Sequence, residues 1–450
     1  MALLPQTFTG GQLRDTVNAA GPLSPPTGFP FRFDLCPLTI SALPGGYHVT
    51  VNPRGLIPAG VWSAQPYHVM VGGNDNLSGL GAYEGDFTNA LGTIKKAVEL
   101  ANAANVPARI IVKAGDYRRD RSMGGTGNIV PTVDIAFIAW GGRVVTGPWD
   151  DLTYTSVGGG VYSAARSNVL RVFDIATVDA NGDYAELTKV TDQATCAATP
   201  GSWAQVSSTL YVNRLDGAVV TNANTRALIL ANGAYFNATS KAVYMEGIDV
   251  EGGSAGGIYA TSTTGNFVAV NCTSKYAGTV GTPVDQFRML NISGVVLLKD
   301  CVGARGRKDA LNFTRDSGTA RTMFVLTIDC VGRDCGSADT NSCNGWTLHQ
   351  DIVGIDIGGR YNNCRGGTVR NINQTRAWMV GATIYGDTSD GDISATEVRL
   401  DNSAMIWLER CDIEATTNAL SATDTTSIFT RDCTIDGAQV TSGSGVIAAF

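Results

Sequence analysis

The feature that most constrains this chain is an irregular internal repeat in its second half. Small or apolar anchor residues recur every 22 to 29 positions, by subtraction of their numbers: Ile248, Cys272, Cys301, Cys330, Ile355, Ala382, Cys411 and Cys433. The residue before each anchor, with the exception of Arg410, is Gly, Asn or Asp, which tolerate a left-handed backbone at a bend: Gly247, Asn271, Asp300, Asp329, Gly354, Gly381 and Asp432. The pattern indicates a chain that completes a circuit, bends at a fixed corner and stacks on the previous circuit.

The length of the circuit predicts the architecture. Between 22 and 29 residues allow three short strands and three corners, and stacked circuits pair as parallel strands about 4.8 Å apart. We therefore expect an all-β fold, a right-handed single-stranded parallel β-helix whose small inward residues pile above one another. A leucine-rich-repeat horseshoe has a similar period, but the regular leucine spacing that it requires is absent.

Composition agrees with a turn-rich β protein. The 450 residues include 54 Gly, and only 16% are charged, against roughly a quarter in an average soluble protein. The low charge excludes a long coiled coil, and the 44% hydrophobic fraction excludes wholesale disorder. A net charge of −7 without any Lys/Arg run argues against nucleic acid as a partner.

The sequence predicts no leader, membrane span, metal site or cofactor. Its first eight residues lack a basic region, and Pro5 interrupts their apolar run, so we expect synthesis in the cytoplasm without a signal peptide. No stretch approaches the roughly 18 apolar residues of a membrane span. The chain has three His and no Cys-x-x-Cys pair, which argues against zinc. One disulfide among Cys330, Cys335 and Cys343 is left open.

Signals in the first half of the sequence, together with the repeat in the second half, divide the chain into four parts. Residues 88–105 have helical periodicity, and an amphipathic helix here would cap the open end of a solenoid. We expect an N-terminal attachment module at 1–70, the capping helix with the first coils at 71–149, an inserted β-rich subdomain at 150–228 and the main coils at 229–450.

Local signals support the two smaller parts. Asn181-Gly182 between apolar runs predicts a hairpin, and the segments 200–203 and 210–212 predict further strands of the insert. In the N-terminal part we expect a short helix near 12–20, Pro-rich turns and strands near 47–51.

Several segments resemble right-handed β-helix proteins of the pectate-lyase-like type, across residues 71–450. They are Val71–Asp75 with Gly92-Thr93-Ile94, Ile110–Tyr117, Gly160–Ala164, Pro200–Trp203 with Leu210–Val212, and Glu246–Gly253. A Gly-rich β-helix without a signal peptide, behind a compact N-terminal module, looks like a phage-type spike, as in tailspikes and the head spikes of gene transfer agents. The resemblance implies a position on the virion surface, contact with other virion proteins through residues 1–70, recognition of host cell-surface capsular polysaccharide and a homo-oligomer, by analogy a trimer.

Candidate catalytic residues lie near the longest loop. Hydrolysis of a glycosidic bond needs two carboxylates, about 5–5.5 Å apart in retaining enzymes and roughly 6.5–9.5 Å apart in inverting ones. If stacking brings Asp309 beside Asp351, these two carboxylates form the pair, with His349 as a proton carrier. A lyase would instead use Lys308 or Arg305 as base and as counter-charge for a uronate. The competing interpretation is that Asp at solenoid corners caps turns.

Candidate glycan-binding residues are aromatic and basic. Trp346, Tyr361 and Trp378 could stack on sugar rings, with Arg305 and Lys308 beside them. Trp378 is equally consistent with packing in the core from a strand. Trp407, just before a corner, is expected to pack in the core rather than to bind a ligand.

Two acidic segments resemble parts of calcium loops. Residues 387–392 (DTSDGD) lack the terminal Glu, and 179–183 (DANGD) is equally incomplete, so solvated turns are expected at both.

Three functional hypotheses follow. The first is a virion spike that binds capsular polysaccharide without cleaving it, because no sharp catalytic signature is present. The second is a polysaccharide depolymerase, either a hydrolase or a lyase. The third is a structural component of the particle without a ligand.

Overall fold

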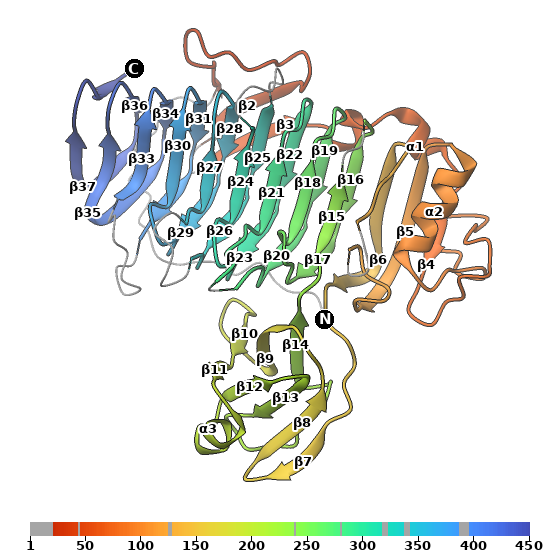
Figure 1. Ribbon diagram of the computed structural model, residues 1–450. Coiled ribbons are helices and arrows are strands. Elements are labelled where there is room, and N and C mark those ends of the chain that lie inside the picture. Colours follow the sequence, from red (N-terminus) through yellow and green to blue (C-terminus); the bar gives the residue numbers. More distant parts are fainter. Residues whose placement is uncertain are drawn as a thin grey trace.

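The computed structural model describes residues 21–43, 46–124, 128–237, 240–279, 281–316, 323–336, 343–386 and 396–450. Its body is a parallel β-helix in which 27 strands join one continuous hydrogen-bonded sheet (Figure 1). Each coil contributes three strands, so the tower has three long faces. The predicted all-β, parallel β-helix fold is confirmed.

We name the three faces by what lies against them. The front sheet, which faces the viewer in Figure 1, holds β15 (Ala234–Asn237), β18 (Ile258–Thr261), β21 (Phe287–Leu290), β24 (Leu311–Thr314), β27 (Trp346–Leu348), β30 (Val369–Asn373) and β33 (Thr396–Asn402). The covered sheet holds β16 (Val243–Glu246), β19 (Phe267–Val270), β22 (Val295–Lys299), β25 (Phe324–Ile328), β28 (Val353–Ile357), β31 (Arg376–Val380), β34 (Met405–Glu409), β36 (Ser427–Arg431) and β38 (Val446–Ala449). The insert-side sheet holds β17 (Ile248–Glu251), β20 (Thr273–Lys275), β23 (Val302–Ala304), β26 (Val331–Arg333), β29 (Arg360–Asn362) and β32 (Thr383–Tyr385). β35 (Asp412–Ala422) and β37 (Thr434–Thr441) run through both the insert-side and the front sheet.

A column of left-handed residues forms the corner between the covered and insert-side sheets. Its members have φ between 51° and 71°: Gly247, Asn271, Asp300, Asp329, Gly358, Gly381, Arg410 and Asp432. Gly, Asn and Asp reach this conformation at the lowest cost, which explains their recurrence in the sequence. The predicted corner is confirmed.

One anchor of the predicted repeat is wrong. The register pairs Val331 with Arg360, so Gly359, preceded by Gly358, occupies the anchor position in place of Ile355 and Gly354. Ile355 lies in β28 and packs against the N-terminal segment on the outside of the tower. The sequence offers Gly at both places, and only the strand register distinguishes them.

The anchor cysteines stack inside the tower. Cys272, Cys301 and Cys330 are buried at successive coils, because the backbone N–H of the residue after each cysteine bonds the cysteine carbonyl one coil before. Burial and the neighbouring Cys272 and Cys330 raise the pKa of the Cys301 thiol, so it stays protonated. All ten cysteines lie in the described residues and carry free thiols, Cys335 and Cys343 included.

The N-terminal end of the tower is capped as the sequence predicted. α2 (Ile94–Ala104) buries Ile94, Ala97, Val98 and Ala101 beside β4 (Tyr67–Val69), β5 (Ala108–Tyr117) and β6 (Ile135–Thr146). Asp75 accepts hydrogen bonds from the backbone N–H groups of Gly92 and Thr93, at 2.8 and 3.0 Å, which ties the Gly-rich segment to the start of the helix.

Residues 21–64 lie along the outer surface of the covered sheet. They form β1 (Gly21–Pro22), β2 (Leu38–Leu43), β3 (Gly46–Val51), the 3₁₀ turn η1 (Pro53–Leu56) and α1 (Ala59–Ser63). Phe29 packs edge-on against Trp378 and Trp407, with ring centroids 6.1 and 5.7 Å apart, and Tyr47 donates a 2.7 Å hydrogen bond to Asp329. This segment therefore covers an apolar face that water would otherwise reach. The predicted helix near residues 12–20 lies outside the described residues.

The β-rich insert leaves the tower after β6 and returns at β15 (Figure 1). It consists of β7 (Thr155–Gly158), β8 (Val161–Ala165), β9 (Val169–Val178), β10 (Tyr184–Glu186), β11 (Thr188–Val190), α3 (Gln193–Ala198), β12 (Ser202–Val206), β13 (Thr209–Asn213) and β14 (Thr225–Ile229). β9 and β10 form the hairpin predicted at Asn181-Gly182. β6 bonds directly to β16 and β17, so the coils stack without interruption past the insert.

Two corner substitutions test the left-handed column. Gly381→Ala should lower the free energy of unfolding by about 1–2 kcal/mol or more, because a β-carbon strains φ 64° and lies 2.8 Å from the Tyr47 ring. Arg410→Gly, at φ 54°, should leave stability unchanged or raise it. Denaturant unfolding measures both variants, and equal losses in the two would contradict the account of the corner.

Candidate functional site

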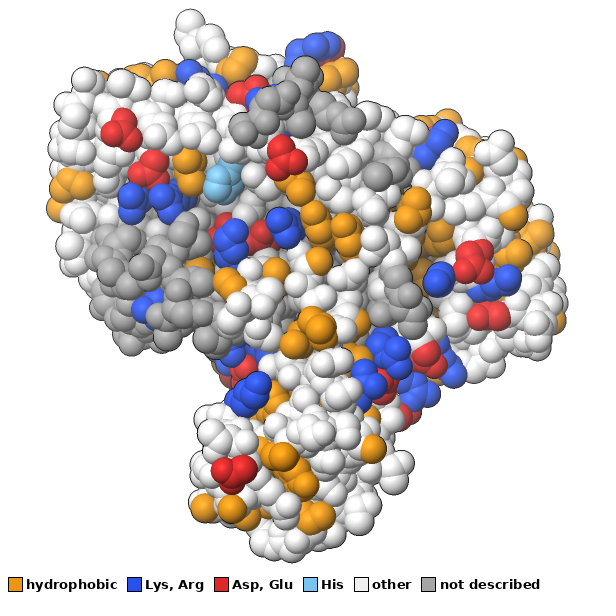
Figure 2. All heavy atoms as spheres, in the orientation of Figure 1, with side chains coloured by type: hydrophobic (Ala, Val, Ile, Leu, Met, Phe, Trp, Pro, Cys, Tyr) orange, Lys and Arg blue, Asp and Glu red, His pale blue; other side chains and the backbone are white. Residues whose placement is uncertain are grey.

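The front sheet directs one residue per coil outward, in register along the tower, and of these Tyr259, Asn312 and Thr347 are buried by their neighbours. This outward column is fixed by the strand pairing and comprises Tyr235, Tyr259, Arg288, Asn312, Thr347, Arg370, Arg399 and Ser421. Adjacent members are separated by the spacing of neighbouring strands, about 4.8 Å. Figure 2 shows this face, with basic, acidic and hydrophobic side chains along its length.

Cations on this face lie outside the carboxylates that they pair with. Arg288 and Lys308 both lie 3.8 Å from Asp285, and their side chains are 33% and 40% exposed while that of Asp285 is 3% exposed. Arg399 is 34% exposed and lies outside Asp401 at 3.1 Å, whereas Arg370, at 2.8 Å, is 17% exposed and thus about as buried as Asp401. In each of the two clusters the most exposed charged group is therefore a cation, Lys308 or Arg399, in a chain whose net charge is −7.

An aromatic pair begins the outward column. The rings of Tyr235 and Tyr259 stack with centroids 4.5 Å apart and an interplanar angle of 8°. The guanidinium of Arg288 lies 4.8 Å from the centre of the Tyr259 ring. Tyr259 is only 7% exposed, so the half-buried Tyr235 offers the flat surface of the kind that packs on sugar rings.

Beneath Lys308, two carboxyl groups from neighbouring coils share a buried environment. The backbone N–H of Asp309 donates to Asp285 at 3.2 Å, and Asp309 accepts from the Asn312 side chain at 2.9 Å and the Asn344 backbone at 2.8 Å. Burial, and then the charge of Asp285, raises the pKa of Asp309 to about 8, and burial also raises that of Asp285. The pair therefore holds a proton at neutral pH.

The predicted pair Asp309–Asp351 is wrong. Asp309 bonds to Asn344 at the start of the front-sheet strands, whereas Asp351 follows their end and forms an ion pair with Arg315 at 2.8 Å. His349 is five positions along the chain from Asn344, or roughly 16 Å for an extended backbone at about 3.3 Å per residue. This exceeds the spacing that either glycosidase mechanism uses.

His349 lies at the Asp351 end of the strands. Its Nε2 is 3.5 Å from the Thr347 hydroxyl. Burial, and then the charges of Lys308 and Arg370, lowers the pKa of His349 to about 4, so the ring is neutral at neutral pH. It is thus not placed to carry a proton between Asp309 and Asp351.

The predicted aromatic platform is also wrong. Trp346 and Tyr361 are 0% exposed and pack inside the tower, where Tyr361 donates a 2.6 Å hydrogen bond to Asp356. Trp378 is 1% exposed beneath Phe29. None of the three can stack on a sugar. In a β-helix both surfaces of a covered sheet are buried, so an aromatic residue in a strand does not reveal which surface reaches solvent.

Arg305 contacts the insert rather than the front sheet. Its carbonyl accepts a hydrogen bond from Arg171 at 3.0 Å, and its guanidinium lies 4.0 Å from Asp183. Asp183 also pairs with Lys275 and Arg333, both at 2.5 Å. The turn 179–183 is therefore not wholly solvated, because the Asp183 side chain is fully buried at the interface with the tower. Residues 387–392 lie outside the described residues.

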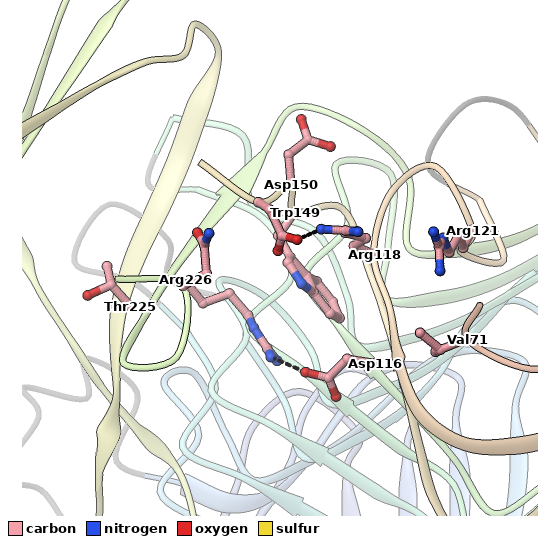
Figure 3. A pocket seen from close by; sticks show the side chains of 10 residues that line it. Val71, Asp116, Arg118, Arg121, Trp149, Asp150, Thr225 and Arg226 are labelled. Carbon is pink, nitrogen blue, oxygen red and sulfur yellow. Dashed lines mark hydrogen bonds and ion pairs between the residues drawn. The ribbon is translucent and has the colours of Figure 1, made fainter. Parts of the chain in front are cut away.

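A cavity of about 210 Å³ lies where the insert meets the first coils (Figure 3). We call it the seam cavity, and its walls are Val71, Asp116, Arg118, Arg121, Trp149, Asp150, Asp151, Asn222, Thr225 and Arg226. The Arg226 guanidinium stacks 4.1 Å from the centre of a Trp149 ring and pairs with Asp116 at 2.8 Å.

Sequence reasoning selected Lys308 as a candidate binding residue but none of the residues of the outward column. A signal was present, since the strands read apolar–polar–apolar as Phe287–Met289, Leu311–Phe313, Trp346–Leu348 and Val398–Leu400, with the outward residue in the middle. Among the described residues, no three His, Cys, Asp or Glu side chains gather to hold a metal ion, and no helix is long and apolar enough to cross a membrane.

Comparisons with known proteins show the fold. No protein family and no curated protein matches the sequence. Among solved structures, a glycoside hydrolase superposes with a TM-score of 0.59 at 10% identity, over 86% of this chain and 96% of that one. XylC in complex with xylose gives 0.49 at 10% identity, over 82% and 69% of the two chains. The Gp54 tailspike of Acinetobacter baumannii bacteriophage AP22, in complex with capsular saccharide, gives 0.28 at 11% identity, over 80% and 70% of the two chains. The protein therefore has the right-handed parallel β-helix fold.

The buried pair predicts an unusual dependence of stability on pH. Because the pKa of Asp309 rises from 3.8 to about 8 on folding, the folded state keeps a proton that the unfolded chain loses, and stability falls as pH rises through this window. Asp309→Asn cannot ionise, so its melting temperature relative to wild type should rise by a few degrees between pH 5 and pH 8. Thermal unfolding at both values measures this, with Asp351→Asn as control, and a constant difference would contradict the shared proton.

Proposed function

We propose that the protein binds an acidic polysaccharide along the outer surface of the front sheet. The observation that carries this proposal is a set of cations on this face, Arg288, Lys308 and Arg399, each more exposed than the carboxylate that it pairs with. An isolated basic patch would suit any anion. A set of cations spread over several coils, with Tyr235 at one end, suits an extended polymer that carries both charge and flat sugar faces.

We propose further that this binding serves attachment of a virion spike to the capsular polysaccharide of a host cell. Contact with other virion proteins through residues 1–70, a position on the particle surface and a homotrimeric assembly belong to this proposal. Within that region, Phe29 and Tyr47 already contact the covered sheet, so contact with a particle would use other side chains.

Cleavage of the polysaccharide is the second candidate function. Asp285 and Asp309 lie on adjacent coils and hold a proton, as a general acid and its partner would. It ranks second because both carboxyl groups are buried beneath Lys308 and Arg288, and Asp309 caps the backbone of Asn344. A structural component without a ligand is the third candidate, favoured if no polysaccharide binds.

Removal of front-sheet cations should weaken binding. The double variant Lys308→Gln/Arg399→Gln should bind polygalacturonate at least tenfold more weakly than wild type in low salt, whereas neutral dextran should bind neither protein measurably. Lys95→Gln/Lys189→Gln removes the same charge from exposed sites on α2 and the insert and should leave binding unchanged. Titration calorimetry measures both, and equal affinities of the two double variants would exclude the front sheet as the binding surface.

Cleavage is tested by assaying the products. A non-enzymatic spike should release no reducing ends and no ultraviolet-absorbing unsaturated uronate from polygalacturonate or host capsule. Release by wild type that is lost in Asp285→Asn, with binding retained, would replace the first candidate by the second.

A further inference from the structure

The seam cavity is built from both structural units of the chain. Asp116 on β5 and Trp149 after β6 belong to the first coils, while Thr225 and Arg226 on β14 belong to the insert. Figure 3 shows Arg226, Trp149 and Arg118 around one hollow. Cavities between two units are common places for small ligands, because each unit can contribute groups that the other lacks.

The charges of the seam cavity compensate one another. Arg226 pairs with Asp116 at 2.8 Å and with Glu251, and Arg118 pairs with Asp151. Asp150, between them, binds Arg119 at 2.9 Å and Arg166 at 3.0 Å. The carboxylates would repel an anionic ligand, and the guanidinium groups would repel a cationic one. The cavity therefore attracts neither kind of charged ligand by its net charge.

The walls nevertheless offer many hydrogen-bonding groups beside one exposed apolar side chain, Val71, while the Trp149 ring is 6% exposed with Arg226 stacked on it. The guanidinium N–H groups of the lining donate and its carboxylate oxygens accept. Asp116 and Asp151 keep 57% of their side chains exposed at the rim, so solvent can enter. This combination matches an uncharged ring that carries several hydroxyl groups and one apolar face.

We propose that the seam cavity is a second carbohydrate site, which takes one neutral pyranose unit. A volume of about 210 Å³ is below the roughly 300–1,000 Å³ of pockets for drug-sized ligands, so it suits a single ring rather than a chain. The site is separate from the front sheet in position and in ligand charge. It goes beyond the proposed function and does not depend on it.

Blocking the seam cavity provides the test. Val71 lines it and is 47% exposed, so Val71→Trp should fill the space and abolish binding of a neutral sugar without disturbing the core. Val106→Trp is the matched control, since Val106 is 50% exposed and does not line the cavity. Arg121→Gln removes a guanidinium from the wall and should weaken binding about fivefold if Val71→Trp fails to fold.

The probes are the methyl glycosides of glucose, galactose and mannose, with galacturonate and glucosamine as charged comparators. At least one neutral glycoside should bind with a Kd on the order of 1 mM in ligand-observed NMR and titration calorimetry. The signal should be lost in Val71→Trp, retained in Val106→Trp and retained in Lys308→Gln/Arg399→Gln.

Two results would overturn this proposal. One is the absence of binding by every neutral glycoside to wild type, and the other is equal binding by Val71→Trp and Val106→Trp. Stronger binding of either charged comparator at this cavity would contradict the assignment to neutral sugars. Loss of polygalacturonate binding in the front-sheet variant leaves these outcomes unaffected, so the two sites can fail separately.

Discussion

The strand register between successive coils is the constraint on which the rest of this structure depends. Each coil bonds to the one before it through backbone groups, so a shift by one residue would turn every inward side chain outward. The buried stack of Cys272, Cys301 and Cys330 and the left-handed column that includes Asp300 and Asp329 both hold that register. Small thiols can stack above one another where larger side chains would collide, and the corner fixes where each coil turns.

The same register creates the candidate binding surface. Arg370 and Arg399 can share Asp401 only because their strands pair directly, and Lys308 and Arg288 meet over Asp285 for the same reason. A charged polymer would therefore meet groups whose spacing is set by the backbone rather than by flexible loops. The other two faces are partly occupied, one by residues 21–64 and one by the insert, which Asp183 joins to three cations of the tower.

The sequence predicted the features that depend on local chemistry. Gly, Asn and Asp marked the corner because they alone reach positive φ at low cost, the periodicity of residues 88–105 marked the cap, and Asn181-Gly182 marked a hairpin. It did not predict contacts across coils, since the other corners vary in length and the number of residues between anchors does not say which strands align. The shift from Ile355 to Gly359, and the separation of Asp309 from Asp351, both have this origin.

The sequence also did not show which side of each strand reaches solvent. Trp378 and Trp407 alternate as outward residues should, yet residues 21–64 cover that face, so outward does not mean exposed. Lys308 could be identified because a lysine at a turn rarely lies in a core. Arg288 and Arg399 lie within strands, where the sequence does not show which side faces solvent.

The most direct measurement is an experimental structure of the protein with a bound oligogalacturonate. The account predicts sugar density along the front sheet, within contact of Lys308 and Arg399, with a ring on or near Tyr235. Density on the insert-side sheet or over residues 21–64, with the front-sheet cations still bound only to Asp285 and Asp401, would contradict it.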